Sequence, residues 1–197
     1  MNRELNDLSA EIKKELTKKR FLHTVRVTVT AQALAMSYGM ETETAGIAGI
    51  LHDCAKCIPD DEKLSLCKQY GLGISPSEAA YPDLLHSKLG AFLAAKKYGI
   101  TDEDVLAAIT YHTTGRPEMT FLEKIIFVAD YIEPGRPDLP KITEIRELAF
   151  HNLDKCVYLI MENTLNYLEA EKQTIDKMTI AARDYYREQV EKQESID

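Results

Sequence analysis

The stretch AGIAGILHDCAKCIP, from Ala45 to Pro59, decides between two readings of this chain. Its apolar residues recur at helical spacing, which predicts a helix with a small apolar face that includes His52. His52 and Asp53 form an adjacent pair of the kind that binds divalent metals. Cys54 and Cys57 form a C-x-x-C, which is typical of a zinc or redox site. The rest of the sequence must distinguish these two interpretations.

Helical periodicity extends along nearly the whole chain. Apolar residues recur at intervals of three and four, and no segment alternates as a half-buried strand does. We therefore expect an all-α protein, with Thr101 as the N-cap of one of its helices. The predicted helices cover residues 5–38 with a break near 18–20, 42–56, 60–69, 82–98, 102–112, 119–131, 142–171 and 176–192.

Two loops stand out between these helices, at residues 71–82 and 133–141. Both are rich in glycine or proline, and neither is long enough to link two domains. We therefore expect one helical domain over residues 1–197, with a motif core at about 20–136 and C-terminal helices at 142–192.

Composition narrows the class of partner. The chain has 197 residues, of which 45% are hydrophobic and 28% charged, and its formal net charge of -8 would repel nucleic acid. We find no apolar run long enough to span a membrane and no signal peptide in the first twenty residues, so we expect a cytoplasmic protein with reduced thiols. Such a protein can still bind a small phosphate compound where a metal and a few arginines reverse the local potential.

Histidines are distributed in an informative way, because four of the five fall on different predicted segments. Each of these four is in line with apolar or small neighbours at helical spacing, so we expect them to point inward and to converge on one metal-centred site. His151 lies in a polar segment and is expected to be exposed. The four inward-facing histidines are His23, His52, His86 and His112.

Asp130 adds a carboxylate to this set. It lies in IIFVADYI, where no nearby cation is available, and an ionised carboxylate buried there would cost several kcal/mol. The apolar periodicity continues past it, which argues against an N-cap and favours a metal ligand. Two imidazoles and two carboxylates suit iron, manganese or another divalent transition metal.

The order of these ligands resembles a known superfamily. His23, then His52-Asp53, then Asp130 on an all-helical chain is similar to the HD-domain metal-dependent phosphohydrolases. The segments RFLHTVRV, GILHDCAK, LLHSKLGA, AITYHTTG and FVADYIEPGR resemble blocks of the YqeK family, bacterial symmetrical bis(5'-nucleosyl)-tetraphosphatases that hydrolyse diadenosine tetraphosphate. IDKMTIAARDYY resembles that family's C-terminal block, although Lys177-Met178 stands where the family usually has His-Pro.

The resemblance implies a set of site residues. An iron-type metal would bind to His23, His52, Asp53 and Asp130. The substrate's phosphates would lie beside the metal ligands Asp53 and Asp130 and against Arg20, His86, His112, Thr113 and Arg136, and the nucleoside beside Met178, Thr179 and Ile180. Lys56, one turn after the ligand pair, could hold the Asp53 carboxylate or a phosphate.

A metal-activated hydroxide would attack a phosphorus beside the central bridging oxygen and release two ADP. Asp53, His86 and His112 are the expected catalytic residues, with either histidine able to act as a general acid. The same two histidines could also hold a second metal, with Asp53 as the bridging ligand.

Three other functions remain open. The first is another HD-type phosphohydrolase, acting on a nucleoside monophosphate, a deoxynucleoside triphosphate or a cyclic nucleotide. The second is a nucleotide-binding regulator without turnover. The third is a zinc or redox protein built on Cys54 and Cys57, which the absence of a second cysteine pair disfavours. A homodimer is also open, because the apolar stripe of the helix expected at 142–171 could pack internally, as we expect, or against a second copy.

Overall fold

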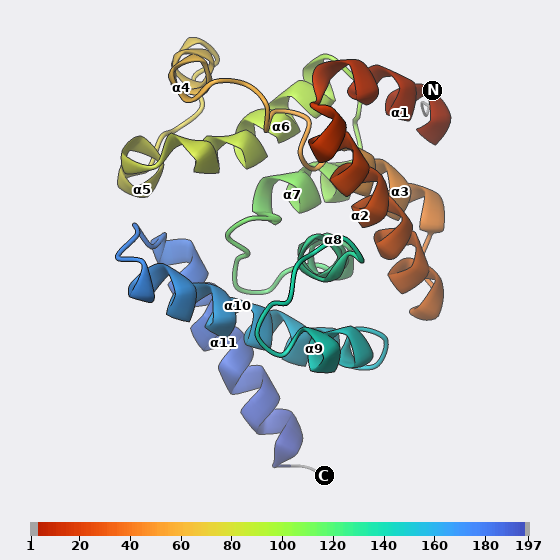
Figure 1. The fold of residues 1–197 in the computed structure, drawn as a ribbon, viewed down its shortest axis with the longest axis vertical. Coiled ribbons are helices and arrows are strands. Elements are labelled where there is room, and N and C mark those ends of the chain that lie inside the picture. Colours follow the sequence, from red (N-terminus) through yellow and green to blue (C-terminus); the bar gives the residue numbers. More distant parts are fainter. Residues whose placement is uncertain (1–3, 196–197) are drawn as a thin grey trace.

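The computed structural model describes residues 4–195, and within that range it contains helices and no β-strand (Figure 1). The prediction of an all-α fold is confirmed. In chain order the elements are α1 (Leu5–Glu15), α2 (Lys18–Ser37), α3 (Thr42–Leu51), α4 (Asp60–Gln69), α5 (Pro76–Ala80), the 3-10 helix η1 (Pro82–Leu84), α6 (Leu85–Lys96), α7 (Glu103–Tyr111), α8 (Phe121–Ile132), α9 (Ile142–Leu148), α10 (Leu153–Ala170) and α11 (Lys177–Glu194).

The helix expected over residues 42–56 is shorter than predicted. It ends at Leu51, and residues 52–57 form successive turns instead of a further helical segment. His52 is the C-cap residue of α3, still with helical backbone angles (φ -53°, ψ -38°). The proposed ligand pair therefore lies at the end of a buried helix, where the chain changes direction.

The helix expected over residues 142–171 is two helices. Asn152 interrupts it, because its side chain accepts a hydrogen bond from Lys155 N (3.0 Å) and so caps a new helix. The prediction that Thr101 caps this helix is also wrong. Asp102 is the N-cap of α7, and its Oδ1 accepts hydrogen bonds from Asp104 N and Val105 N. Short polar side chains before a helix compete closely for the cap, and spacing alone does not rank them.

The segment expected to be a loop at residues 71–82 contains the short helix α5. Ser75 and Glu78 form a reciprocal capping box there, which satisfies two amides at the helix start. With η1, this helix leads the chain into α6, so the connection is more ordered than its glycine and proline content predicted.

Figure 1 shows α8 end-on at the centre of the molecule, with α2 and α3 on one side, α7 above it and α9 and α10 below. Close packing of α2 on α3 depends on Gly49, where a Cβ atom would lie 2.9 Å from Thr28 Cα. One hydrophobic core runs from Leu8 on α1 to Tyr186 on α11. The polar cluster described below is therefore enclosed by helices that the core holds in place.

The apolar stripe predicted for the region of α10 packs internally. Val157, Ile160 and Met161 are all at most 2% exposed and belong to the main core. Gly115 (φ 63°) closes the turn after α7 so tightly that a Cβ atom there would overlap the side chain of Met161. Of the helices between residues 4 and 195, none combines the length and the apolar character that crossing a membrane requires.

Candidate metal centre

Four buried histidines have the same arrangement. In each ring, Nδ1 meets an oxygen that can only accept, so Nδ1 carries the proton: Gly49 O for His52 (2.7 Å), Asp83 O for His86 (2.5 Å), Ile109 O for His112 (2.7 Å) and the Glu133 carboxylate for His23 (3.1 Å). Fixing the tautomer in this way leaves Nε2 of every ring unprotonated, with a lone pair that can bind a metal or accept a hydrogen bond. The inward convergence expected for these histidines is therefore present.

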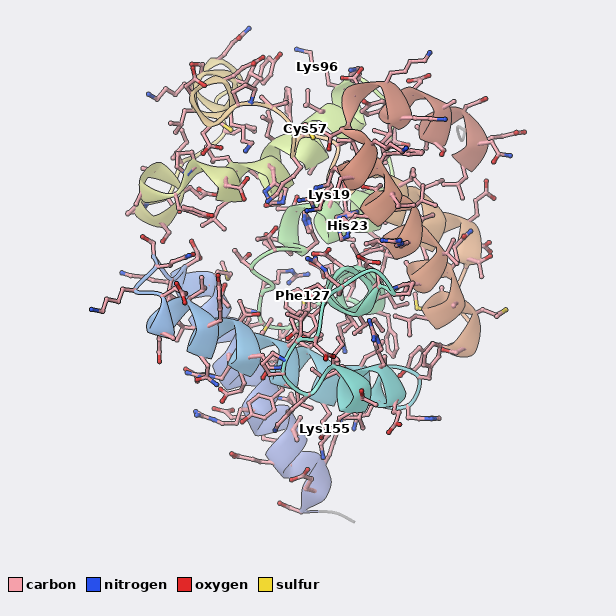
Figure 2. All side chains as sticks on the ribbon, in the orientation of Figure 1. Lys19, His23, Cys57, Lys96, Phe127 and Lys155 are labelled. Atoms are coloured by element: carbon pink, nitrogen blue, oxygen red, sulfur yellow. The ribbon has the colours of Figure 1, made fainter. Side chains whose placement is uncertain are left out.

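Asp53 lies where the four rings meet. Its Oδ2 is 3.4 Å from His52 Nε2 and 3.7 Å from His23 Nε2, and its Oδ1 is 3.4 Å from His86 Nε2 and 3.7 Å from His112 Nε2. The carboxylate thus divides the site into a His23 side, at Oδ2, and a His86 side, at Oδ1. In Figure 2, His23 is labelled on α2 near the middle of the molecule.

Asp130 reaches the His23 side from α8. Its Oδ1 lies 3.0 Å from His23 Nε2 and 3.9 Å from His52 Nε2. Our expectation that Asp130 has no nearby cation is wrong, because Arg136 Nη2 lies 2.6 Å from the same oxygen. Burial opposes ionisation of this carboxyl, yet the contacts with His23 and Arg136 hold the pKa of Asp130 below its ordinary value.

The electrostatics of Asp53 and His52 follow the same logic. Burial alone would raise the pKa of Asp53, but the surrounding imidazoles, His52 first, hold it well below the ordinary value. Burial likewise opposes protonation of His52, and the neighbouring Asp53 carboxylate raises the pKa of His52 overall. The Asp53 side chain is only 3% exposed, and Arg20 Nη1 donates to its Oδ2 at 2.8 Å.

The donor set fits a divalent metal. Nε2 of His23 and Nε2 of His52 are buried and make no aligned hydrogen bond, which is rare for buried polar atoms and fits a role as metal ligands. Within residues 4–195, two groups bring ligand atoms within 4.8 Å of one another: His23, His52 and Asp130, and His52, Asp53 and His112. The protein therefore has a histidine and aspartate cluster that could bind a metal.

The cysteines belong to neither group. Cys54 is buried and its Sγ donates to Gly90 O (3.4 Å), whereas Cys57 is exposed. Gly90 therefore brings α6 against the turn after α3, where a Cβ atom on Gly90 would be in ordinary contact with Cys54 Sγ (3.4 Å). Of the two readings of this turn, the geometry favours His52 and Asp53.

The His86 side is built differently from the His23 side. Nε2 of His86 and Nε2 of His112 are 3.1 Å apart, and Thr113 Oγ1 lies within 3.2 Å of both. Burial lowers the pKa of His86 against the opposing pull of Asp53. Because both Nδ1 atoms already donate to carbonyls, the pair can share one added proton or accept from Thr113, which suits contact with a phosphate oxygen.

Two carboxylates that sequence reasoning missed orient this site. Glu133 is 3% exposed and holds His23 from the end of α8. Asp83 presents its carbonyl to His86, and its carboxylate accepts from Lys56 Nζ (2.5 Å) and from Lys63 Nζ (3.2 Å). Glu133 follows Asp130 by one helical turn, and that spacing was the available signal.

The position of Lys56 corrects a prediction. Lys56 does not hold Asp53; it pairs with Asp83 and lies 3.4 Å from His86 Nδ1, while Arg20 pairs with Asp53. Burial opposes ionisation of Asp83, and Lys56 more than offsets it, so the pKa of Asp83 is lowered. Lys56 therefore supports the His86 side from behind.

The predicted nucleoside residues lie at the start of α11. Met178 and Ile180 are 41% and 38% exposed, whereas Thr179 is buried. In the described part of the chain, no hydrogen bond or ion pair joins these three to the cluster; α11 is tied to the segment after α7 by the bond from Met119 N to Tyr186 Oη (2.9 Å). Their role stays a prediction.

Comparisons with known proteins agree with this geometry. The family model of the HD domain matches residues 20–135. A symmetrical bis(5'-nucleosyl)-tetraphosphatase of Bacillus subtilis (strain 168) is 41% identical over 175 residues, covering 89% of this chain and 92% of the relative. The enzyme of that name from Staphylococcus aureus (strain NCTC 8325 / PS 47) is 40% identical over 176 residues, covering 88% and 90%.

A solved structure is similar over nearly the whole chain. It is the crystal structure of a predicted HD superfamily hydrolase involved in NAD metabolism from Clostridium acetobutylicum. The TM-score is 0.91 at 38% sequence identity, covering 96% of this chain and 100% of that chain. The resemblance therefore extends through the C-terminal helices as well as the histidine and aspartate cluster.

Proposed function

Since the chain belongs to the HD-domain family and, within it, to the symmetrical bis(5'-nucleosyl)-tetraphosphatases, we propose that it hydrolyses diadenosine tetraphosphate to two ADP in a metal-dependent reaction. The observation that carries the proposal is the convergence of four tautomerically fixed Nε2 atoms on Asp53, beside arginines that can bind phosphate. A nucleotide regulator without turnover would not require this complete ligand set.

The proposed metal ligands are His23, His52, Asp53 and Asp130. Their mixture of imidazole and carboxylate suits iron, with manganese or another divalent ion as an alternative. When bound, such an ion would lower the pKa of a water and neutralise charge on a phosphoryl oxygen. The unsatisfied nitrogens of His23 and His52 support this assignment.

Arg20 and Arg136 are the proposed phosphate-binding residues on the His23 side. Arg20 pairs with Asp53 and Arg136 with Asp130, and both side chains are 32% exposed, so each has N–H groups left for a substrate oxygen. A guanidinium that is already held by a carboxylate loses little freedom on binding a phosphate. On the His86 side, Thr113 would donate from its hydroxyl group.

The proposed reaction consumes one water per substrate. The water oxygen forms a bond to a phosphorus beside the central bridging oxygen and its proton passes to solvent, while the P–O bond to that bridging oxygen breaks and one ADP leaves with the electron pair. Asp53 orients the reacting groups, and the pair His86 and His112 can give the shared proton to the leaving phosphate. Because ADP is already a good leaving group, we expect this proton transfer to assist the reaction without being essential.

Several further assignments are part of this proposal. Met178, Thr179 and Ile180 would contact a nucleoside, and Lys56 would act by positioning His86. We also propose that the enzyme is cytoplasmic and binds no membrane, and the net charge of -8 supports the proposal that it binds no nucleic acid. The main hydrophobic core, which extends from α1 to α11, supports residues 1–197 acting as one domain, and solution mass measurement tests whether two chains form a homodimer.

Product analysis tests the proposed function. Protein purified anaerobically should contain a divalent transition metal, and incubation with diadenosine tetraphosphate should yield ADP as the only nucleotide product. ATP plus AMP, or no turnover with any added metal, would contradict the proposal. Tight ADP binding without hydrolysis would identify a regulator, and turnover of monophosphates, deoxynucleoside triphosphates or cyclic nucleotides alone would identify a different phosphohydrolase.

A further inference from the structure

A cationic cavity adjoins the His23 side of the metal centre. It has a volume of about 340 Å³, within the usual range of roughly 300–1,000 Å³ for small-molecule sites. His23 and Glu133 line its inner end. The remaining charged residues around it are basic: Lys19, Arg20, Arg26 and Arg136. In a chain with a net charge of -8, this is a local reversal of sign. We call it the Arg26 cavity.

Two of these basic side chains, Lys19 and Arg26, are not paired closely with any carboxylate that the structure describes. In the region that the structure describes, Lys19 makes no hydrogen bond or ion pair with a side-chain carboxylate. Arg26 approaches a carboxylate only at 4.0 Å, between its Nε and Glu133 Oε2. The Glu133 oxygens already accept from His23 and from Gly135 N. The charges of Lys19 and Arg26 are therefore available to a ligand.

The position of Arg26 depends on a glycine. A Cβ atom on Gly135 would overlap the Arg26 guanidinium, so this side chain lies directly against the backbone after α8. Gly135 does not have a positive φ, so its backbone is open to alanine as well. The absence of a side chain at position 135 thus leaves room for the guanidinium beside the cavity.

We propose that the Arg26 cavity binds the phosphates of the second ADP half of the substrate, with Lys19 and Arg26 as specificity-determining residues. This rests on the proposed function, because a dinucleotide cleaved at its centre must place one ADP half on each side of the reacting phosphorus. One half would lie on the His86 side, against Thr113. The other half must then extend to the opposite side of Asp53, where His23 lines the Arg26 cavity.

Steady-state kinetics with two variants test this subsite. Arg26→Ala and Lys19→Ala should each raise KM for diadenosine tetraphosphate about tenfold to a hundredfold, as loss of one charge-assisted hydrogen bond predicts. The inhibition constant of ADP should rise by a smaller factor than KM, because ADP can still bind in the other half-site, at the metal and His86. Lys18→Ala is the matched control: it removes the same charge one residue away, outside the cavity.

A second variant guards against indirect effects. Gly135→Ala keeps every charge but displaces the Arg26 guanidinium and crowds Glu133 Oε2 (2.9 Å), so it should reproduce the KM effect of Arg26→Ala. Metal analysis checks that the contact between Glu133 and His23 is kept, and combining the two substitutions should add little to KM. Unchanged KM in the Arg26 and Lys19 variants would overturn the subsite while the wild-type activity stands. Equal weakening of substrate and ADP would overturn it too, because that indicates a general field effect. Absence of wild-type turnover would instead reject the proposed function itself.

Discussion

The two ends of α8 each carry an acid, and the two acids are satisfied in different ways. At the start, both oxygens of the fully buried Glu123 are occupied: Arg116 donates from Nε (2.7 Å) and Nη2 (2.8 Å), and Thr120 N donates as well (2.6 Å). At the end, Asp130 pairs with Arg136 and also faces His23, whose Nε2 makes no aligned hydrogen bond.

The difference shows that buried charge does not by itself identify a functional site. Glu123 is a complete unit with Arg116 and the capping residue Thr120, so nothing more is needed to compensate its burial. Asp130 belongs to a cluster in which two buried imidazole nitrogens lie near carboxylates but make no aligned hydrogen bond. Incomplete hydrogen bonding, and not burial alone, is what fits a metal-binding role.

The largest expected effect on activity is at the C-terminal end of α8, where Asp130 lies. Asp130→Asn keeps the side-chain shape but removes the negative charge, so the purified protein should lose most of its metal, and turnover of diadenosine tetraphosphate should fall at least about 1,000-fold. Metal analysis and initial rates measure this, and a thermal melt checks that the fold persists. Retention of metal and activity would remove Asp130 from the ligand set.

At the start of α8, where Glu123 is fully paired, substitution should change the stability of the protein and not its metal binding. Arg116→Ala leaves the Glu123 carboxylate buried without its cation, which should lower the free energy of unfolding by about 3 kcal/mol. KM and metal content should stay at their wild-type values when measured well below the melting temperature. A raised KM with unchanged stability would reverse the assignment and make Arg116 a phosphate-binding residue.

Sequence reasoning predicted the inward convergence of the histidine and aspartate cluster because the environment of these residues is local. His23, His52 and Asp130 stand among apolar neighbours at helical spacing, and a buried polar residue in such a run is conspicuous in one dimension. The order of these residues along the chain, on helices far apart in sequence, then supplied the family resemblance.

What sequence reasoning missed depends on tertiary contacts. Glu133 and Asp83 lie in segments that look like ordinary polar connections, and their role comes from the histidines that the fold brings to them. Lys56 was expected to hold Asp53 or a phosphate, with Asp53 offered because the two are close in sequence, whereas Asp83 is the carboxylate that Lys56 contacts in space. The break at Asn152 was missed because apolar periodicity resumes in phase on both sides of a short interruption.

Substitution of Glu133, which follows the C-terminal end of α8, should have an intermediate effect. Glu133→Gln keeps an oxygen near His23 Nδ1 but removes the charge that orients the ring, so metal affinity should fall about tenfold to a hundredfold. Competition with a chelator measures this. Glu123→Gln is the matched control on the same helix and should leave metal affinity unchanged. Equal losses in both variants would mean that the effect is a general one of charge on α8.

The last effect is confined to alkaline pH and comes from other buried groups, on α10 and α11. Cys156 is fully buried on α10, and burial, with Glu144, raises the pKa of its thiol from 9.0 to about 12. Burial also raises the pKa of Tyr186 on α11. Between pH 9 and pH 12 the unfolded thiol ionises while the folded thiol does not, so the unfolded state binds fewer protons and stability falls as pH rises.

Below pH 9 the Cys156 thiol is protonated in both states and contributes no pH dependence. Above that pH it should cost at most about 1.4 kcal/mol per pH unit. Urea unfolding of the wild type and of Cys156→Ala, measured at several alkaline pH values, isolates this contribution, since all other groups are common to both proteins. The variant should start less stable, because it loses the contact of Sγ with Ile145 O, but its stability should decline less steeply with pH. Parallel declines would show that the buried thiol does not control the alkaline limit, and the loss would then belong to tyrosines such as Tyr186.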